Sequence, residues 1–125
     1  MKYLIDANIC IRLLGSGSEG LKERVRERDA GDIGISAIAF AEVALGSRNG
    51  KAPSLAVLDH FRSQIPVLPF DELAAKKYAE LPFSRGSYDR LIAAHALALD
   101  LILVTDNERH FSTISNLRVE NWVAA

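Results

Sequence analysis

The chain has 125 residues, 49% of them hydrophobic and 25% charged, and its 15 Lys and Arg residues nearly balance its 16 Asp and Glu residues. This composition is typical of a globular protein, and we expect residues 1–125 to form a single domain. Cys10 is the one cysteine, which excludes an internal disulfide. No apolar run approaches the ~20 residues that cross a bilayer, and no signal-peptide pattern is present, so we expect a cytoplasmic protein.

The net charge of −1 does not suit a protein that coats nucleic acid through a strongly basic surface. A polyanion would have to be met by a local basic patch or by bound metal cations. The charge therefore leaves nucleic-acid binding open but restricts how it is achieved.

The first third of the chain alternates short apolar runs with longer periodic ones. A buried strand is expected at 2–5, a helix at 8–14 that ends at "GSGSEG", and a charged, exposed helix at 21–28. A second strand follows at 32–35. Ser36 then caps a helix over 37–45, for which Gly46 is the expected stop.

The remainder of the chain repeats the alternation. We expect helices at 54–63, 71–81 and 88–99 and strands at 65–70, 101–105 and 117–122. Strands separated by helices predict an α/β fold in three layers, with a central parallel sheet and helices on both faces. In such sheets ligands bind outside the carboxyl ends of the strands.

Two aspartates follow predicted strands directly. Asp6 ends "YLID" and Asp106 ends "LVTD", so both should lie at the same edge of the sheet. An aspartate after a strand also serves as a turn residue or as the N-cap of the next helix. Taken singly, each residue fits that structural role.

Two further acids lie on apolar helices. Glu42 is the only charge in "SAIAFAEVALG", a segment whose apolar sides predict a buried helix. A buried carboxylate needs a positive partner, which could be an arginine or a metal ion. Asp89 lies in the first turn of the helix at 88–99, where an acid also interacts favourably with the helix dipole.

Four carboxylates in one cleft would repel one another and raise one another's pKa values. Hard divalent cations such as Mg²⁺ and Mn²⁺ relieve that repulsion, because they prefer oxygen ligands and leave room for a substrate phosphate. Such ions polarise phosphoryl groups and activate water. The combination therefore points to hydrolysis of phosphodiester bonds.

Four blocks together resemble the PIN-domain family, and more narrowly the VapC-type ribonuclease toxins of prokaryotic toxin–antitoxin modules. They are "YLIDANICIRLL", "ISAIAFAEVALGS", "YDRLIAAHALAL" and "LILVTDNERHFSTISNLRVENW". The resemblance implies a PIN-like fold and a Mg²⁺- or Mn²⁺-dependent endoribonuclease. It also implies a VapB-like antitoxin as partner, RNA as substrate, and a homodimer.

The resemblance assigns the acidic site residue by residue. Asp6, Glu42 and Asp89 match the family's metal-site acids. The fourth position falls on Asp106 or Asn107, and we favour Asp106 as the fourth catalytic residue, with Asn107 in support.

Ser36 and Thr105 match small hydroxyl positions that support such a site. Two features depart from the family pattern. Ala7 replaces a threonine that is common after the first acid, and the link at 82–87 is short. Both could lower activity or alter which RNA enters, but neither removes a metal ligand.

Basic residues adjoin the acidic segments. Arg48, Arg85, Arg90 and Arg109 could hold RNA phosphates around the site, although any one of them also fits a solvated surface. The histidines could in principle cleave RNA without metal. His60 and His95 fit packing positions better, and His110 lies near the proposed edge.

Two rival functions remain open. The chain could be a PIN-like module that binds RNA or protein without cleavage, which Ala7 and the short link favour. It could also be a PIN nuclease of RNA processing that has no antitoxin.

Overall fold

The computed structural model describes residues 1–29 and 31–123. These residues form one parallel sheet, and its strands are β1 (Tyr3–Ile5), β2 (Ile33–Ser36), β3 (Val67–Leu68), β4 (Ile102–Val104) and β5 (Val119–Glu120). The helices are α1 (Ala7–Leu14), α2 (Glu19–Arg26), α3 (Ala37–Arg48), α4 (Leu55–Arg62), α5 (Glu72–Glu80), α6 (Tyr88–Leu99) and the short 3-10 helix η1 (Glu108–Phe111).

The sheet has the strand order β3-β2-β1-β4-β5, and every neighbouring pair is parallel. The chain starts in the central strand, builds outward through β2 and β3, and then crosses to β4 and β5 on the other side. The strand order therefore reverses between β1 and β4. In open α/β sheets, the crevice outside the carboxyl ends of two such strands is where ligands bind.

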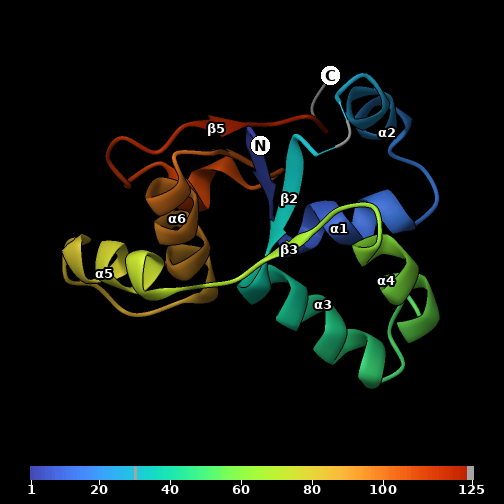
Figure 1. Cartoon of the computed structure of the whole chain (residues 1–125), viewed down its shortest axis with the longest axis horizontal. Coiled ribbons are helices and arrows are strands. Elements are labelled where there is room, and N and C mark those ends of the chain that lie inside the picture. Colours follow the sequence, from blue (N-terminus) through green and yellow to red (C-terminus); the bar gives the residue numbers. More distant parts are fainter. Residues whose placement is uncertain (30, 124–125) are drawn as a thin grey trace.

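Helices cover both faces of the sheet, as the alternating pattern predicts. Figure 1 shows α5 and α6 on one side of the strands and α1, α2 and α4 on the other. The strands are short and apolar because both of their faces are buried. Leu4, Ile5, Leu103 and Val104 have no exposed surface, and they belong to one continuous hydrophobic core.

The register brings the ends of β1 and β4 together. Ile5 lies opposite Val104, so the next residue of each strand, Asp6 and Thr105, leaves the sheet at the same place. The backbone N–H of Asp6 still donates to the carbonyl of Val104, at 3.4 Å. The ends of β1 and β4 therefore place Asp6 and Thr105 at the predicted edge of the sheet.

Three expectations about element ends are wrong. Helix α3 does not stop at Gly46 but continues to Arg48, where Asn49 is the C-cap. The hydroxyl of Ser47 lies 3.1 Å from the Val43 carbonyl and 2.5 Å from the Pro53 carbonyl, and its one hydrogen can be donated to either, which holds this last turn in place. The strands expected at 65–70 and 117–122 shrink to two residues each, and η1 was not expected.

The burial expected for α3 is also wrong. Only Ala39, Val43 and Ser47 of this helix are buried, whereas the Leu45 side chain is 64% exposed. Helix α3 leaves the sheet at the end of β2 and extends outward (Figure 1). The side of the helix that carries Leu45 is therefore not covered by the described part of the chain. Among the described residues, no helix combines the length and apolar character needed to cross a membrane.

Candidate active site

Asp6 occupies the centre of the strand-end edge. It is the N-cap of α1, where its Oδ1 accepts from the Ile9 backbone N–H at 3.0 Å. Its Oδ2 accepts from the Thr105 hydroxyl at 2.5 Å. The residue is only 5% exposed and has no cationic partner in the described part of the chain. Asp6 therefore both caps α1 and lies at the strand-end edge.

Thr105 is oriented by the turn that follows β4. The Asn107 backbone N–H donates to Thr105 Oγ1 at 3.0 Å, so the hydroxyl hydrogen is free to point at Asp6. Thr105 is completely buried. This arrangement orients one carboxylate oxygen and leaves the capping contact to the other.

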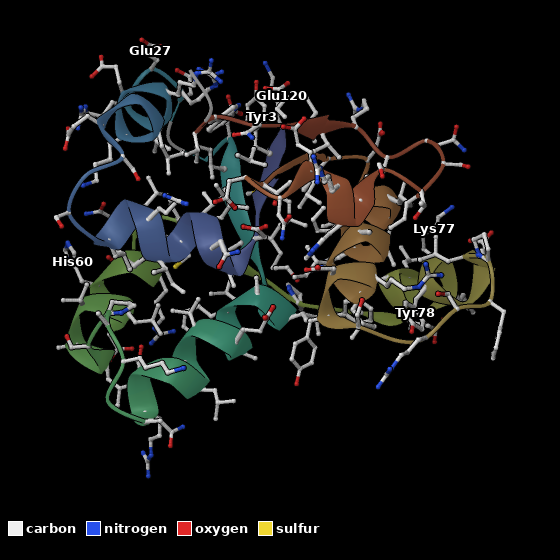
Figure 2. All side chains as sticks on the ribbon, turned by 180° about the vertical axis from the view of Figure 1, so that it is seen from behind. Tyr3, Glu27, His60, Lys77, Tyr78 and Glu120 are labelled. Carbon is white, nitrogen blue, oxygen red and sulfur yellow. The ribbon has the colours of Figure 1, made fainter. Side chains whose placement is uncertain are left out.

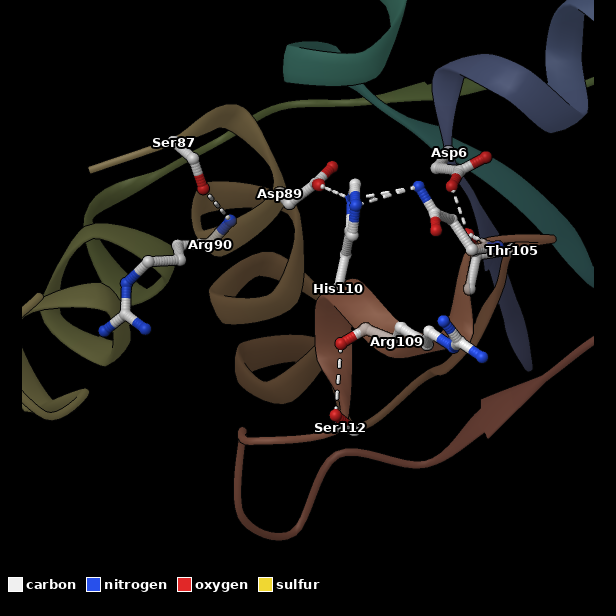
Figure 3. A network of polar contacts seen from close by, with 9 residues as sticks. Asp6, Ser87, Asp89, Arg90, Thr105, Arg109, His110 and Ser112 are labelled. Atoms are coloured by element: carbon white, nitrogen blue, oxygen red, sulfur yellow. Dashed lines mark hydrogen bonds and ion pairs between the residues drawn. The ribbon is translucent and has the colours of Figure 1, made fainter. Parts of the chain in front are cut away.

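Asp89 lies in the first turn of α6, which Ser87 caps by accepting from the Arg90 backbone N–H at 3.2 Å. Its Oδ2 contacts Nδ1 of His110 at 2.8 Å. The amide nitrogen of Asn107 lies 2.9 Å from the same ring nitrogen. Figure 3 shows the His110 ring between Asp89 on one side and Asp6 with Thr105 on the other.

Glu42 is half-buried in α3 and has neither an ion pair nor a hydrogen-bond partner within the described residues. The arginine partner that the sequence left open is therefore not found among them. Glu42 lies between two hollows of about 360 Å³ each. One hollow separates α3 from α1, and the other is bordered by Leu45 and Tyr88.

Asp106 differs from the other acids because it has a cation of its own. Nε of Arg12, in the last turn of α1, donates to Asp106 Oδ2 at 2.8 Å. The other oxygen, Oδ1, is buried without a hydrogen-bond partner. Asp106 is thus neutralised by Arg12 through one oxygen only.

The acids act on one another electrostatically. Burial raises the pKa of Asp6, and the charges of Asp106 and Asp89 raise it further, against the lowering effect of its hydrogen bonds. Burial also raises the pKa of Glu42, to which Asp89 and Asp6 add. The structure therefore places the four predicted acids close enough for their charges to interact, and ionisation of Asp6 and Glu42 is unfavourable without a cation.

The acids are not arranged as a closed ligand set. Across residues 1–29 and 31–123, no three Asp, Glu, His or Cys side chains gather tightly enough to hold an ion as they stand. The reason is visible in the contacts: Asp89 is directed at His110, and Asp106 at Arg12. The donor atoms are nevertheless carboxylate oxygens, which suit a hard divalent cation.

Ser36 links the start of α3, the helix that carries Glu42, to α6. Its hydroxyl caps α3 by accepting from the Ile38 N–H at 3.1 Å, and it lies 2.9 Å from Nδ1 of the buried His95. Burial lowers the pKa of His95, against the opposing effects of the Pro69 carbonyl and Asp71. A neutral His95 thereby ties α6 to the start of α3, in agreement with the packing role expected for it.

The four arginines predicted to bind RNA are placed differently. Arg109 lies in η1 and extends toward Thr105 in the view of Figure 3. Arg90 turns away from Asp89 in the same view, and its Nη2 donates to the Pro82 carbonyl at 2.6 Å. Arg48 ends α3, and Arg85 lies exposed in the link before α6.

The sequence analysis did not predict that Arg12 contacts an acid of the site, and it assigned His110 no partner. The signal for Arg12 was present, because it is the only charge in "ANICIRLL", just as Glu42 is the only charge in its helix. His60, by contrast, lies on α4 at the periphery, far from the strand ends (Figure 2).

Comparisons with known proteins agree with this geometry. Residues 3–117 match the family model of the PIN domain. The chain is 33% identical to the tRNA(fMet)-specific endonuclease VapC of Shigella flexneri, with 98% of each chain covered. A DNA-bound VapBC structure from Salmonella typhimurium matches with a TM-score of 0.84 and 34% identity over 98% of both chains. The DNA-bound VapBC2 structure from Rickettsia felis matches with a TM-score of 0.84 and 30% identity over 98% of this chain and 99% of that one. The chain therefore belongs to the PIN-domain family and, within it, to the VapC-type proteins.

Proposed function

We propose that this protein is a metal-dependent endoribonuclease that acts as the toxin of a type II toxin–antitoxin pair, with residues 1–125 as its single domain. The observation that carries the proposal is the set of four acids with interacting charges at the point where the strand order reverses. Its relatives include an endonuclease specific for tRNA(fMet). RNA is therefore the proposed substrate class. Metal ions bound by the acids would meet its negative charge, so the protein does not need a positive net charge.

Asp6, Glu42 and Asp89 are the proposed metal ligands. Two of them, Asp6 and Glu42, have raised pKa values and no cationic partner in the described residues, so a bound cation would relieve an unfavourable charge. Asp89 would have to exchange His110 for the ion. Mg²⁺ or Mn²⁺ fits best, because every available ligand is a carboxylate oxygen.

When bound, a divalent ion supplies charge stabilisation to the phosphoryl group and activates water for its hydrolysis. The chain's own residues prepare the site for this. Thr105 and the Ile9 N–H fix the orientation of Asp6, and Ser36 begins the helix that carries Glu42. Asp106 assists from the neighbouring strand end, and Asn107 holds Thr105. The expected products carry a 5′-phosphate and a 3′-hydroxyl.

Arginines around the site are proposed to bind RNA phosphates. Arg109 is the best placed of the four, since it follows directly on the β4 turn. Arg48 and Arg85 would contact more distant phosphates. Arg90 would have to release the Pro82 carbonyl in order to take part.

A VapB-like antitoxin and a second copy of this chain are the proposed protein partners, in the cytoplasm. The VapBC structures from Salmonella typhimurium and Rickettsia felis support the antitoxin. The hollow between α1 and α3 has Ile11 and Leu45 at its border, and their side chains are 40% and 64% exposed. A protein partner covering this hollow would also cover Glu42 and so block the site.

The rival function is RNA binding without cleavage. The contacts of Asp89 with His110 and of Asp106 with Arg12 favour it, because each of these acids already has a side-chain partner without an ion. The rival predicts that RNA binds but is not cut with any divalent metal.

The test compares growth arrest on expression of the wild type, Asp6→Asn and Asp59→Asn. Asp59 is a matched control, an exposed aspartate on α4 that pairs with Arg62. We expect arrest with the wild type and Asp59→Asn but not with Asp6→Asn. The purified protein should cut RNA with Mg²⁺ or Mn²⁺ and stop in excess EDTA. Equal cleavage in EDTA, or arrest by a folded Asp6→Asn protein, would contradict the proposal.

A further inference from the structure

Within residues 1–29 and 31–123, Arg12 is the only arginine or lysine whose side chain contacts one of the four acids. It projects from the last turn of α1, and its Nε lies 2.8 Å from Asp106 Oδ2. The Arg12 side chain is 44% exposed, whereas that of Asp106 is 16% exposed. The pair therefore has a sheltered anion at its inner end and a solvent-facing cation at its outer end.

The contact uses only one N–H of the guanidinium. An arginine has five N–H donors in a planar fork. In the described residues, the remaining four N–H groups of Arg12 have no protein partner. A guanidinium that is fixed at one edge and open at the other presents its free donors to a ligand without further loss of side-chain freedom.

The location selects the chemistry of that ligand. Thr105, the residue before Asp106, donates to Asp6, so the Arg12–Asp106 pair flanks the acid at the centre of the site. An RNA chain that reaches Asp6 brings phosphates on both sides of the bond to be cut. A planar fork of N–H donors matches the oxygens of a phosphate.

Resting on the proposed function, we propose that Arg12 binds a backbone phosphate of the RNA substrate and that Asp106 is a positioning residue for Arg12. Asp106 then assists cleavage by holding the guanidinium and does not bind the metal. This role accounts for the fact that Asp106 alone among the strand-end acids has an arginine. It also places a positive charge where four carboxylates would otherwise repel RNA.

The experiment measures RNA binding separately from cleavage. In the Asp6→Asn background and in EDTA, fluorescence anisotropy reports the affinity for a short labelled single-stranded RNA. Adding Arg12→Gln should weaken binding about tenfold, as expected for loss of a charge-assisted contact. The slope of log K against log salt should become shallower by about 0.7, the share of one phosphate contact on a single strand. Arg26→Gln is the matched control, since Arg26 is exposed and paired to Glu23 at 2.9 Å, and it should bind as the parent does.

The active protein gives a second readout. Arg12→Gln should raise KM about tenfold and leave kcat within about twofold, and Asp106→Asn should act in the same direction but less. Mn²⁺ affinity, measured by calorimetry, should be unchanged in Asp106→Asn. If Arg12→Gln does not fold, Arg12→Lys keeps the charge beside Asp106 and should show a smaller loss of RNA affinity.

Unchanged RNA affinity and salt slope in the Arg12 variants would overturn the inference, and so would loss of Mn²⁺ binding in Asp106→Asn. Either result leaves the proposed nuclease intact. Failure of the unmodified protein to cut RNA with any divalent metal would instead refute the nuclease, and the binding experiment would still decide the role of Arg12.

Discussion

The carboxyl ends of β1 and β4 each carry an aspartate, but the two carboxylates have partners of opposite kinds, neutral donors for one and an arginine for the other. Asp6, after β1, is buried and receives two neutral donors, the Ile9 N–H and the Thr105 hydroxyl. Asp106, one residue further out after β4, receives a guanidinium. One strand end is left with uncompensated negative charge, and the other is already neutral.

The difference teaches that position alone does not assign a role to an acid. The rule that the carboxyl ends of parallel strands meet at one edge predicts the location of both aspartates. Their partners decide what each can do next. A carboxylate with neutral donors still attracts a divalent cation, whereas one held by arginine is better suited to orient that arginine.

The largest expected effect comes from Asp6→Asn, which removes the uncompensated charge and nearly preserves shape. Asparagine is as good an N-cap as aspartate, so the fold should persist. Cleavage should fall about a thousandfold or more, because the electrostatic contribution of a catalytic ion is worth several kcal/mol. RNA cleavage rates at saturating Mg²⁺ measure this, with Asp106→Asn as the comparison. Equal losses in the two variants would remove the distinction between the strand ends.

Thr105→Val is expected to have an intermediate effect. It removes the donor to Asp6 and also leaves the Asn107 N–H without its acceptor. Loss of such a supporting contact typically costs 10–100-fold in metal affinity or activity, so we expect a loss of about that size. Titration of activity against Mg²⁺ concentration checks it, and the loss should be partly recovered at high Mg²⁺. Wild-type metal dependence in this variant would mean that the hydroxyl does not orient Asp6.

The smallest expected effect is on stability as a function of pH. Asp6 and Glu42 have folded-state pKa values raised above those of the unfolded chain, so the metal-free folded state binds protons more tightly. Stability should therefore fall as pH rises from about 4, the unfolded value, through the raised folded values. Each unit by which burial raises a pKa contributes about 1.4 kcal/mol to this loss.

Urea unfolding of the metal-free protein across this pH range measures the effect. Asp6→Asn should flatten the dependence and be more stable than the wild type at pH 7 in EDTA. Mg²⁺ should stabilise the wild type and do less for the variant. An unchanged pH profile in Asp6→Asn would show that Asp6 carries no ionisation penalty.

Much of the architecture follows from local patterns. The places of Asp6 and Asp106 after β1 and β4, the Ser36 cap and the position of Asp89 in the first turn of α6 were all predictable, because capping and strand-end rules act over a few residues. The prediction that α3 stops at Gly46 was wrong, because the contact of the Ser47 hydroxyl with the Pro53 carbonyl holds a further turn of the helix. The exposed side of α3 was also missed, because an apolar helix is assumed to be covered within its own chain.

The contacts that distinguish the acids were not predictable. Arg12 and Asp106 are 94 residues apart in the chain, and His110 and Asp89 are 21 apart. Which long side chain reaches which acid depends on the crossing of α1, η1 and α6 over the sheet edge. Charge counts and periodicity contain no information on that crossing, so the sequence could not show that Asp106 pairs with Arg12 or that Asp89 contacts His110.

Calorimetric titration of Mn²⁺ into the purified protein tests the central account most directly, with the wild type, Asp6→Asn and Asp106→Asn compared at pH 7. The account predicts saturable binding by the wild type, its loss in Asp6→Asn and its retention in Asp106→Asn. Binding by a folded Asp6→Asn protein with wild-type affinity would contradict the claim that the end of β1 is where the cation is held.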